Sequence, residues 1–323
     1  MLTSRAISPL AQIAGVFARL QRARVAREGL DAMLKLPTDH GGSASGPQTK
    51  FHRPELKPDL TFDQISHAYE KDQRPALVIP QMTIKSGERV ALIGRIGSGK
   101  STLLKLAAGL MPPSQGRVLV DGTDLAAIEM ADVRRDIGSF HQDAGLFFGT
   151  ARSNLQLAAP GASDEALIAA LETVGPTASL FTEGQGLDMV IQEGGRGLSS
   201  GQRQALMLGR TLARHPRALL LDEPTGSMDE NTERAFLNNL RRWLGHRTLI
   251  VATHRYAVLD IVDRVIVVDN GRVVLDGPKA DVVRALSASP PATTGEPATV
   301  KQPTRPATVP VASITKGGTG HAA

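Results

Sequence analysis

Residues 94–101 read GRIGSGKS, and this stretch decides the fold expected for the chain. It lies between an apolar run suited to a strand, Arg89–Gly94, and a run with helical character, Lys100–Gly109. Glycines in such a turn let backbone N–H groups point inward, and the N-terminus of the following helix adds the positive end of its dipole. The stretch is therefore a candidate phosphate-binding loop. The flanking strand and helix disfavour the alternative of a chance glycine-rich turn.

This loop assigns candidate roles to individual side chains. Lys100 would reach the β- and γ-phosphates of a nucleotide, and the Ser101 hydroxyl would ligate Mg²⁺. The candidate nucleotide-binding residues of this segment are Gly94, Gly97, Ser98, Gly99, Lys100, Ser101 and Thr102. Lys100 is also counted among the candidate catalytic residues.

A second apolar run, Ala218–Leu221, ends in two carboxylates, Asp222 and Glu223. A buried strand would deliver Asp222 to the metal, while Glu223 can face the γ-phosphate and polarise the attacking water. Paired acids at a strand end are also common on protein surfaces. With the phosphate loop upstream, however, the pair indicates a nucleoside triphosphatase.

Residues 198–202 read LSSGQ and lie roughly twenty residues before the two carboxylates. They form a second candidate phosphate-recognition loop, separate from the first. A chain with two such loops would contribute them to two different sites, so that each nucleotide is held between two copies. The sequence therefore predicts a homodimer.

Four further positions fit the same site, each with a plainer alternative. Gln142 can touch both the metal and a partner surface, or be a solvated loop residue. His254, after the strand-like run Thr248–Thr253, can contact the γ-phosphate or be a structural histidine. Tyr69, placed before the first core strand, can stack on adenine or pack against the sheet. Asp229 can lie at a contact between two copies or be a solvated turn carboxylate.

Composition places the chain among globular proteins with a core of their own. Its 323 residues are 41% hydrophobic and 21% charged, with no cysteine, which excludes disulfides and thiolate metal sites. The formal charge is +5, and much of the excess lies at Arg5, Arg19, Arg22, Arg24 and Arg27. A basic segment at one end suits an anionic membrane surface as well as a phosphate backbone. No apolar run reaches the roughly eighteen residues needed to span a bilayer.

The chain is expected to have four parts. A helical extension covers residues 1–39, with helical spacing over 10–35 and an end near Pro37, and a linker covers 40–56. A compact α/β domain covers 57–286, and a tail rich in Pro, Ala and Thr, expected to be disordered, covers 287–323.

Strand-like and helical runs alternate within the compact domain. The expected strands are Arg89–Gly94, Gly116–Asp121, Ala218–Asp222, Thr248–Thr253 and Val265–Asp269, and the expected helices are Lys100–Gly109, Asp164–Val174, Gly201–Arg214 and Thr232–Leu244. This alternation predicts a largely parallel sheet covered by helices.

The order of these motifs resembles the ATPase domain of ATP-binding cassette (ABC) transporters over residues 57–285. The resemblance is carried by Tyr69, GRIGSGKST, Gln142, LSSGQRQ, LLLDEPT, SMD and His254. It implies a phosphate-loop NTPase core with a mixed, mostly parallel sheet, an antiparallel β subdomain and a helical signature subdomain. It also implies ATP and Mg²⁺ as cofactors.

The resemblance further implies roles for single residues. Ser199 and Gly201, with Gln202 beside them, would bind the γ-phosphate of the ATP held by the opposite subunit. Glu223 would be the catalytic base and His254 the switch residue. The implied metal ligands are Ser101, Gln142 and Asp222. The chain departs from the family at Ser200, where glycine is usual. It also departs at His141, because other residues are more usual before the glutamine at position 142.

Four segments look most like type I secretion exporters, which move proteins or peptides. They are residues 94–102, 142–155, 193–204 and 253–278, and residues 4–37 resemble the cytosolic end of the last membrane helix of such exporters. We therefore expect an ATPase subunit at the cytoplasmic face of the inner membrane. Its partners would be a second copy and a membrane-spanning domain on another chain, with no nucleic acid.

Three alternatives remain open from the sequence. The chain can be an importer-type ABC ATPase, an ABC ATPase without a transport role, or a non-catalytic remnant of a truncated exporter. It can likewise be a split subunit, a fragment or the product of a misplaced start.

Overall fold

The computed structural model describes residues 2–35, 50–70 and 74–288, with side chains from residue 15 onward. The chain divides into two units, Met1–Val283 and Arg284–Ala323, and residues 284–288 of the second unit are described. Part of the predicted linker and most of the predicted tail therefore lie outside the described residues.

The extension forms one helix, α1 (Leu2–Leu34), which begins earlier than the predicted residues 10–35 and contains Pro9. Its described side chains from Val16 onward are exposed. None of the helices described here combines the length and the hydropathy needed to cross a membrane.

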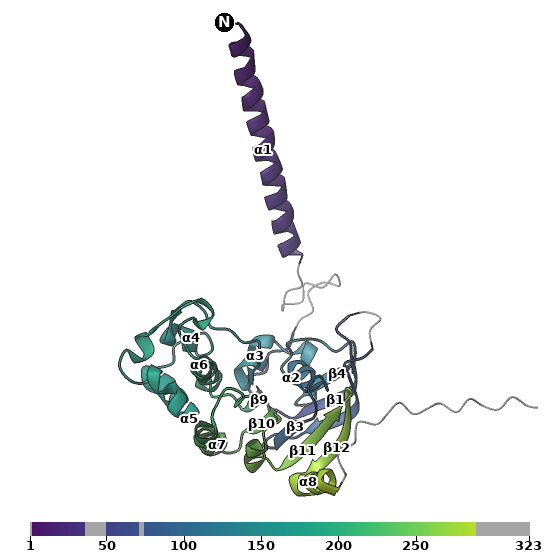
Figure 1. Ribbon diagram of the computed structural model, residues 1–323. Coiled ribbons are helices and arrows are strands. Elements are labelled where there is room, and N and C mark those ends of the chain that lie inside the picture. The colour runs from purple at the N-terminus through teal and green to yellow at the C-terminus, as the bar shows by residue number, and fades with distance from the viewer. Residues whose placement is uncertain (1, 36–49, 71–73, 289–323) are drawn as a thin grey trace, which may run out of the picture. The chain divides into compact units, whose positions relative to one another are not determined.

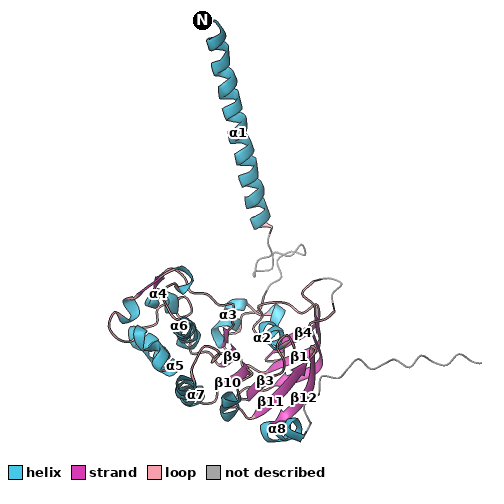
Figure 2. Ribbon diagram, viewed as in Figure 1, coloured by secondary structure: helices cyan, strands magenta, loops and turns pink. Residues whose placement is uncertain are grey.

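A sheet of ten strands organises the rest of the domain, in the order β5-β4-β1-β2-β12-β11-β3-β10-β9-β6 (Figures 1 and 2). The parallel part contains β6 (Ile137–Phe140), β9 (Ala218–Asp222), β10 (Thr248–Ala252), β3 (Arg89–Ile93) and β11 (Arg264–Asp269). The other part contains β12 (Arg272–Pro278), β2 (Leu77–Ile84), β1 (Leu60–His67), β4 (Gln115–Val120) and β5 (Thr123–Asp124), paired mostly antiparallel. The predicted mixed α/β fold is confirmed.

Helices cover the sheet and form a lobe beside it. They are α2 (Lys100–Ala107), α3 (Met130–Asp136), α4 (Ala151–Gln156), α5 (Asp164–Val174), α6 (Ser200–Ala213), α7 (Glu230–Leu244) and α8 (Lys279–Ala288). Figure 1 shows α4, α5 and α6 grouped together, away from β1 and β4. A small ribbon of β7 (Gly149–Thr150) and β8 (Val190–Ile191) belongs to the segment between β6 and α6.

The central strands are buried on both faces of the sheet. Because packing on both sides restricts each strand, the position of its last residue is fixed. On β9, Leu219 and Leu221 join the core under the helical lobe, and Ala218 and Leu220 join the core on the other face. An apolar strand covered on both sides is typical of parallel sheets. Asp222, the last residue of β9, is therefore fixed at the edge where the strand emerges.

The structure corrects one expectation about the start of the sheet. Tyr69 was expected before the first core strand, but it follows β1 (Leu60–His67), which pairs with β2 and β4. The sequence LTFDQISH has no long apolar run, so its strand depends on partners distant in the sequence.

The described end of the predicted linker packs on the domain. Leu56 is fully buried, and its N–H donates to the Asp136 carboxylate at 2.9 Å. Phe51 forms a bridge with Ile128.

Candidate nucleotide site

The phosphate loop connects β3 to α2 and requires glycine for its backbone shape. Gly94 has a φ of 151°, and a Cβ there would lie 2.0 Å from the carbonyl oxygen of Val268. Gly97 and Gly99 also have positive φ values, of 78° and 106°. A side chain at Gly94 would therefore push the loop away from the neighbouring strand β11.

Lys100 folds over this loop. Its ammonium donates hydrogen bonds to the carbonyl oxygens of Gly94 at 2.8 Å and Arg95 at 3.0 Å. Burial lowers the pKa of Lys100, and the nearby carboxylates of Glu223 and Asp222 act in the opposite direction. A partly desolvated ammonium at the helix start is well suited to phosphate oxygens.

The loop fits a phosphate group on two further observations. The Ser98 hydroxyl is buried and has no hydrogen-bond partner among the described residues. The helix α2 begins at Lys100, so the first N–H groups of its opening turn have no carbonyl partner within the helix. Both features are donors that a bound phosphate would satisfy.

Asp222 and Ser101 form the part of the site suited to a hard cation. Asp222 is 3% exposed and accepts a hydrogen bond from Ser101. Burial raises the pKa of Asp222, and the bond from Ser101 opposes that rise. Mg²⁺ typically takes one or two carboxylates, water and substrate phosphates, and not an all-protein cage. Within the part of the chain that the structure describes, no three or more His, Cys, Asp or Glu residues form a cluster that could hold a metal ion.

Glu223 is held in a defined orientation just beyond β9. Its backbone has a φ of 50°, which is uncommon for a residue with a side chain. The Nδ1–H of His254 donates to Glu223 Oε1 at 2.8 Å, and the Thr253 hydroxyl donates to Oε2 at 3.4 Å. The His254 side chain is 67% exposed, against 12% for Glu223. The Glu223 carboxylate is thus held by hydrogen bonds from Thr253 and His254, the two residues that follow β10.

The structure brings Gln142 to the same place. Gln142, Glu223 and His254 line one cavity of about 540 Å³, together with residues of the helical lobe such as Ser200 and Gln204. Gln142 itself is exposed in the loop after β6. Of the three predicted metal ligands, Gln142 lines this cavity with Glu223 and His254, whereas Ser101 and Asp222 are not among its lining residues.

Tyr69 lies at the other end of the phosphate loop. Its hydroxyl is 2.8 Å from the Thr102 hydroxyl, and its ring meets the His67 ring edge-on at 5.2 Å. The residue remains 57% exposed, which leaves ring surface for another planar group. The contact with Thr102 ties the aromatic ring to helix α2.

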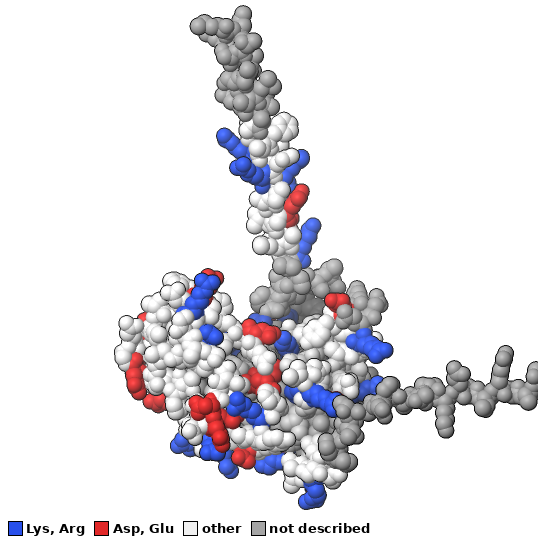
Figure 3. All heavy atoms as spheres, in the orientation of Figure 1, with Lys and Arg blue, Asp and Glu red and all other residues white. Residues whose placement is uncertain are grey.

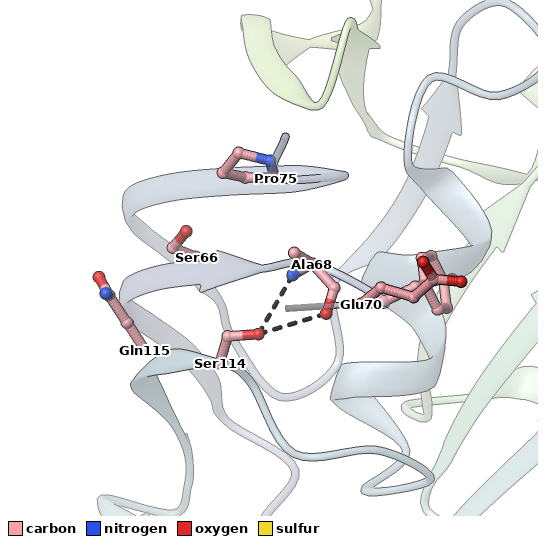
Figure 4. A pocket seen from close by; sticks show the side chains of 7 residues that line it. Ser66, Ala68, Glu70, Pro75, Ser114 and Gln115 are labelled. Carbon is pink, nitrogen blue, oxygen red and sulfur yellow. Dashed lines mark hydrogen bonds between the residues drawn. The ribbon is translucent and has the colours of Figure 1, made fainter. Parts of the chain in front are cut away.

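A cavity of about 320 Å³ adjoins Tyr69 (Figure 4). It is lined by Ser66, Ala68, Tyr69, Glu70, Pro75, Ser114 and Gln115. The Ser114 hydroxyl accepts from the Ala68 N–H at 3.1 Å and donates to the Ala68 carbonyl at 3.4 Å. The cavity lies beside the Tyr69 ring, and none of its lining residues belongs to the phosphate loop.

Ser199, Gln202 and Gly201 form the first turn of α6. The Ser199 hydroxyl accepts from the Gln202 N–H at 3.1 Å, and the Gln202 side chain accepts from the Ser199 N–H at 2.9 Å. This is a capping box, so both side chains have a local role at the helix start. Gly201 is buried, and a Cβ there would lie 3.1 Å from Thr177 Cγ2.

Asp229 caps α7 and is exposed. Its carboxylate accepts from the N–H groups of Asn231 and Thr232, each at 3.0 Å, and from the Thr232 hydroxyl at 2.8 Å. The backbone hydrogen bond from Thr232 is the main cause that lowers the Asp229 pKa. The sequence reasoning named Asp229 and Ser199 but missed their capping roles, which the patterns D-x-x-T and S-x-x-Q signal.

His141, the residue before Gln142, is buried at 9% exposure. Both ring nitrogens lack a hydrogen-bond partner among the residues described. Burial lowers the His141 pKa, while the nearby Asp222 carboxylate acts to raise it. The buried His141 ring therefore lies close to Asp222, which is one of the predicted metal ligands.

Taken together, the phosphate loop, the Ser101–Asp222 pair and the anchored Glu223 define a phosphate-loop nucleotide-binding domain. Residues 79–226 match the family model described as "ABC transporter". The chain therefore contains an ATPase domain of the ABC transporter family.

Curated relatives are translocation ATP-binding proteins of toxin export. The chain is 32% identical over 284 residues to the leukotoxin export ATP-binding protein LtxB of Aggregatibacter actinomycetemcomitans, covering 88% of this chain and 39% of the relative. It is 33% identical over 279 residues to the alpha-hemolysin translocation ATP-binding protein HlyB of Escherichia coli, covering 86% of this chain and 38% of that protein. The chain thus spans well under half the length of these relatives.

A solved structure gives the same result for the fold. It is entitled "Structure of a bacterial Atm1-family ABC exporter with ATP bound" and has a TM-score of 0.71 with 28% sequence identity. The similarity covers 87% of this chain and 49% of the exporter chain.

Proposed function

We propose that this chain is the ATP-hydrolysing subunit of an ABC exporter, working as a head-to-tail dimer that drives membrane helices on another chain. The observation that carries this proposal is the Glu223 carboxylate, anchored by His254 at 2.8 Å beside a preformed phosphate loop. A general base needs a fixed orientation toward its water, and this anchoring supplies it.

These contacts support the following roles for the residues. Lys100 and the loop formed by Gly94, Gly97, Ser98 and Gly99 bind the ATP phosphates, and Tyr69 with Thr102 holds the adenine end. Ser101, Asp222 and Gln142 hold Mg²⁺, which would neutralise phosphate charge when bound. Glu223 accepts the proton of the attacking water. His254 donates to Glu223 through Nδ1, and its opposite ring nitrogen would donate to the γ-phosphate in the imidazolium form, which carries a proton on both nitrogens.

Residues 198–202, the signature segment of the ABC family, support the dimer. Ser199 and Gly201 lie at the start of α6, where Gly201 faces Thr177 and Ser227 of its own chain. An N-terminal helix turn that presents a serine and backbone N–H groups is suited to an anion. We assign Ser199, Gly201 and Gln202 to the γ-phosphate of ATP on the opposite subunit, with Asp229 near the contact between the two copies.

The type of transporter rests on the relatives and on α1. The match to LtxB covers 284 residues, more than the 230 residues from 57 to 286, so it extends beyond the ATPase domain. The printed names of LtxB and HlyB support a protein or peptide cargo. We infer a peripheral position at the cytoplasmic face of the inner membrane, where α1 continues toward the membrane partner.

Nucleic acid is not among the partners we propose. On the face shown in Figure 3, Lys and Arg side chains alternate with Asp and Glu over the domain. A nucleic-acid interface normally presents a clustered basic surface.

Steady-state ATP hydrolysis with Mg²⁺ tests the proposal. The purified chain is expected to release phosphate from ATP, and Lys100→Ala is expected to abolish this release because the loop loses its cation. Wild-type turnover no higher than that of Lys100→Ala would instead identify a non-catalytic remnant.

A further inference from the structure

Gln204 joins the signature helix to the backbone around the catalytic carboxylate. Its amide nitrogen donates to the Glu223 carbonyl oxygen at 3.1 Å, and its amide oxygen accepts from the Ser227 N–H at 3.1 Å. The side chain is 7% exposed. One side chain therefore holds both ends of the segment 223–227 that connects β9 toward α7.

The same segment is held from its other side by the residue after His254. Arg255 donates through Nη2 to the Gly226 carbonyl oxygen at 3.3 Å and through Nη1 to Glu233 at 3.1 Å. The segment is thus clamped between α6 and the residues that follow β10. Because Glu223 has a φ of 50°, the direction of its peptide groups needs such support.

Gln204 also lies on the face of α6 that carries the signature. Residues three apart on a helix share a face, so Gly201 and Gln204 are neighbours along the helix surface. A Cβ placed at Gly201 would lie 3.4 Å from the Ser227 carbonyl oxygen, and Gln204 accepts from the Ser227 N–H, so both positions lie beside Ser227. A displacement of the first turn of α6 would therefore be transmitted to Ser227 and Glu223.

We propose that Gln204 is a positioning residue that couples contact of Ser199 and Gly201 with the ATP of the opposite subunit to the orientation of Glu223. This inference rests on the proposed function. When the signature turn binds, Gln204 carries the α6 position to the backbone of Glu223, and His254 completes the alignment of the carboxylate. A shift of the signature turn on binding would therefore move the Glu223 backbone, which Gln204 already holds in the isolated chain.

The variant Gln204→Met tests this role, because methionine has similar length and no hydrogen-bonding amide. We expect kcat for ATP hydrolysis to fall about tenfold, since catalytic geometry is sensitive to small misplacements. The dissociation constant of ATP for the monomer should stay within about twofold, because the phosphate loop is untouched. In a Glu223→Gln background, Gln204→Met should still allow the ATP-bound dimer to form.

Thr211→Val is the matched control on the same helix. It removes the hydrogen bond that the Thr211 hydroxyl donates to the Met207 carbonyl oxygen at 3.0 Å, a bond in which no residue of the segment 223–227 takes part. This variant should keep wild-type kcat. If Gln204→Met does not fold, Gln204→Glu replaces it; a carboxylate retains the acceptor for Ser227 and loses the donor to Glu223, so kcat should again fall.

The outcomes distinguish failure of the proposed function from failure of the role proposed for Gln204. A wild-type enzyme without turnover overturns the proposed function and this inference with it. An active wild type with an unchanged kcat in Gln204→Met overturns the inference alone. Loss of ATP affinity in parallel with kcat, or loss of the ATP-bound dimer, would also overturn it, because Gln204 would then serve binding and not alignment.

Discussion

Replacement of His141 by leucine is expected to stabilise the nucleotide-free protein. His141 is 9% exposed, and neither ring nitrogen has a partner among the described residues. A buried polar group without a hydrogen bond costs about 1–3 kcal/mol, and leucine fills a similar volume without polar atoms. We therefore expect His141→Leu to raise the free energy of unfolding by about 1–2 kcal/mol, which corresponds to about 3–6 °C in Tm for a domain of this size.

The stabilisation should depend on pH in a defined direction. Burial holds the pKa of folded His141 below the value of about 6.5 for an exposed histidine. As pH falls below 6.5, the unfolded chain therefore binds a proton before the folded chain does, and wild-type stability decreases. Leucine removes this loss, so the advantage of His141→Leu should grow between pH 7.5 and pH 5.5.

Thermal and urea-induced unfolding at these two pH values, in EDTA and without nucleotide, measure both effects. His246→Leu is the control, because His246 is exposed and its replacement removes no buried imidazole. A His141→Leu protein less stable than wild type, or an advantage independent of pH, would contradict this prediction. An advantage independent of pH would mean that His141 binds protons alike in the folded and unfolded states.

Three further substitutions test separate parts of the site. Tyr69→Ala should weaken ATP binding about 5- to 30-fold through lost stacking on the base, whereas Tyr69→Phe should stay within about threefold in equilibrium titration, although its bond to Thr102 is lost. Ser199→Ala should lower turnover more than about tenfold and leave monomer affinity for ATP unchanged; a large loss of monomer affinity would contradict the assignment to the opposite subunit. Arg255→Ala should lower the free energy of unfolding by about 2 kcal/mol in urea titration, because Glu233, at 7% side-chain exposure, loses its ion-pair partner. An unchanged midpoint would show that this pair contributes nothing.

Local signals were sufficient to predict the elements that hold the phosphates. The apolar run of β9 and the glycine-rich turn before α2 are continuous in the sequence, and the predicted helix Asp164–Val174 matches α5 in full. The strand β1 was missed because its apolar residues Leu60, Phe62 and Ile65 do not keep strict alternation, which breaks at the register shift between Asp63 and Ser66. The position of Tyr69 was misjudged for the same reason.

The site residues also differ in whether a local sequence motif or contacts distant in the sequence reveal them. Glu223 and His254 were named from motifs, and the structure brings their side chains to 2.8 Å. Gln204 was not named, because its partners Glu223 and Ser227 lie 19 and 23 residues along the chain and meet it when α6 joins the core that also contains Leu219 and Leu221 of β9. The burial of His141 was likewise set by packing around the loop and not by its neighbours in sequence.

The oligomeric state of Glu223→Gln with ATP and Mg²⁺ tests the shared site most directly. The substitution keeps the side-chain length and removes the base, so ATP should bind without hydrolysis and hold two copies together. We predict a monomer without nucleotide and a dimer at saturating ATP in sedimentation analysis, with Ser199→Ala on the same background returning the protein to the monomer. A Glu223→Gln protein that binds ATP and stays monomeric at micromolar concentration would contradict a nucleotide held between two copies.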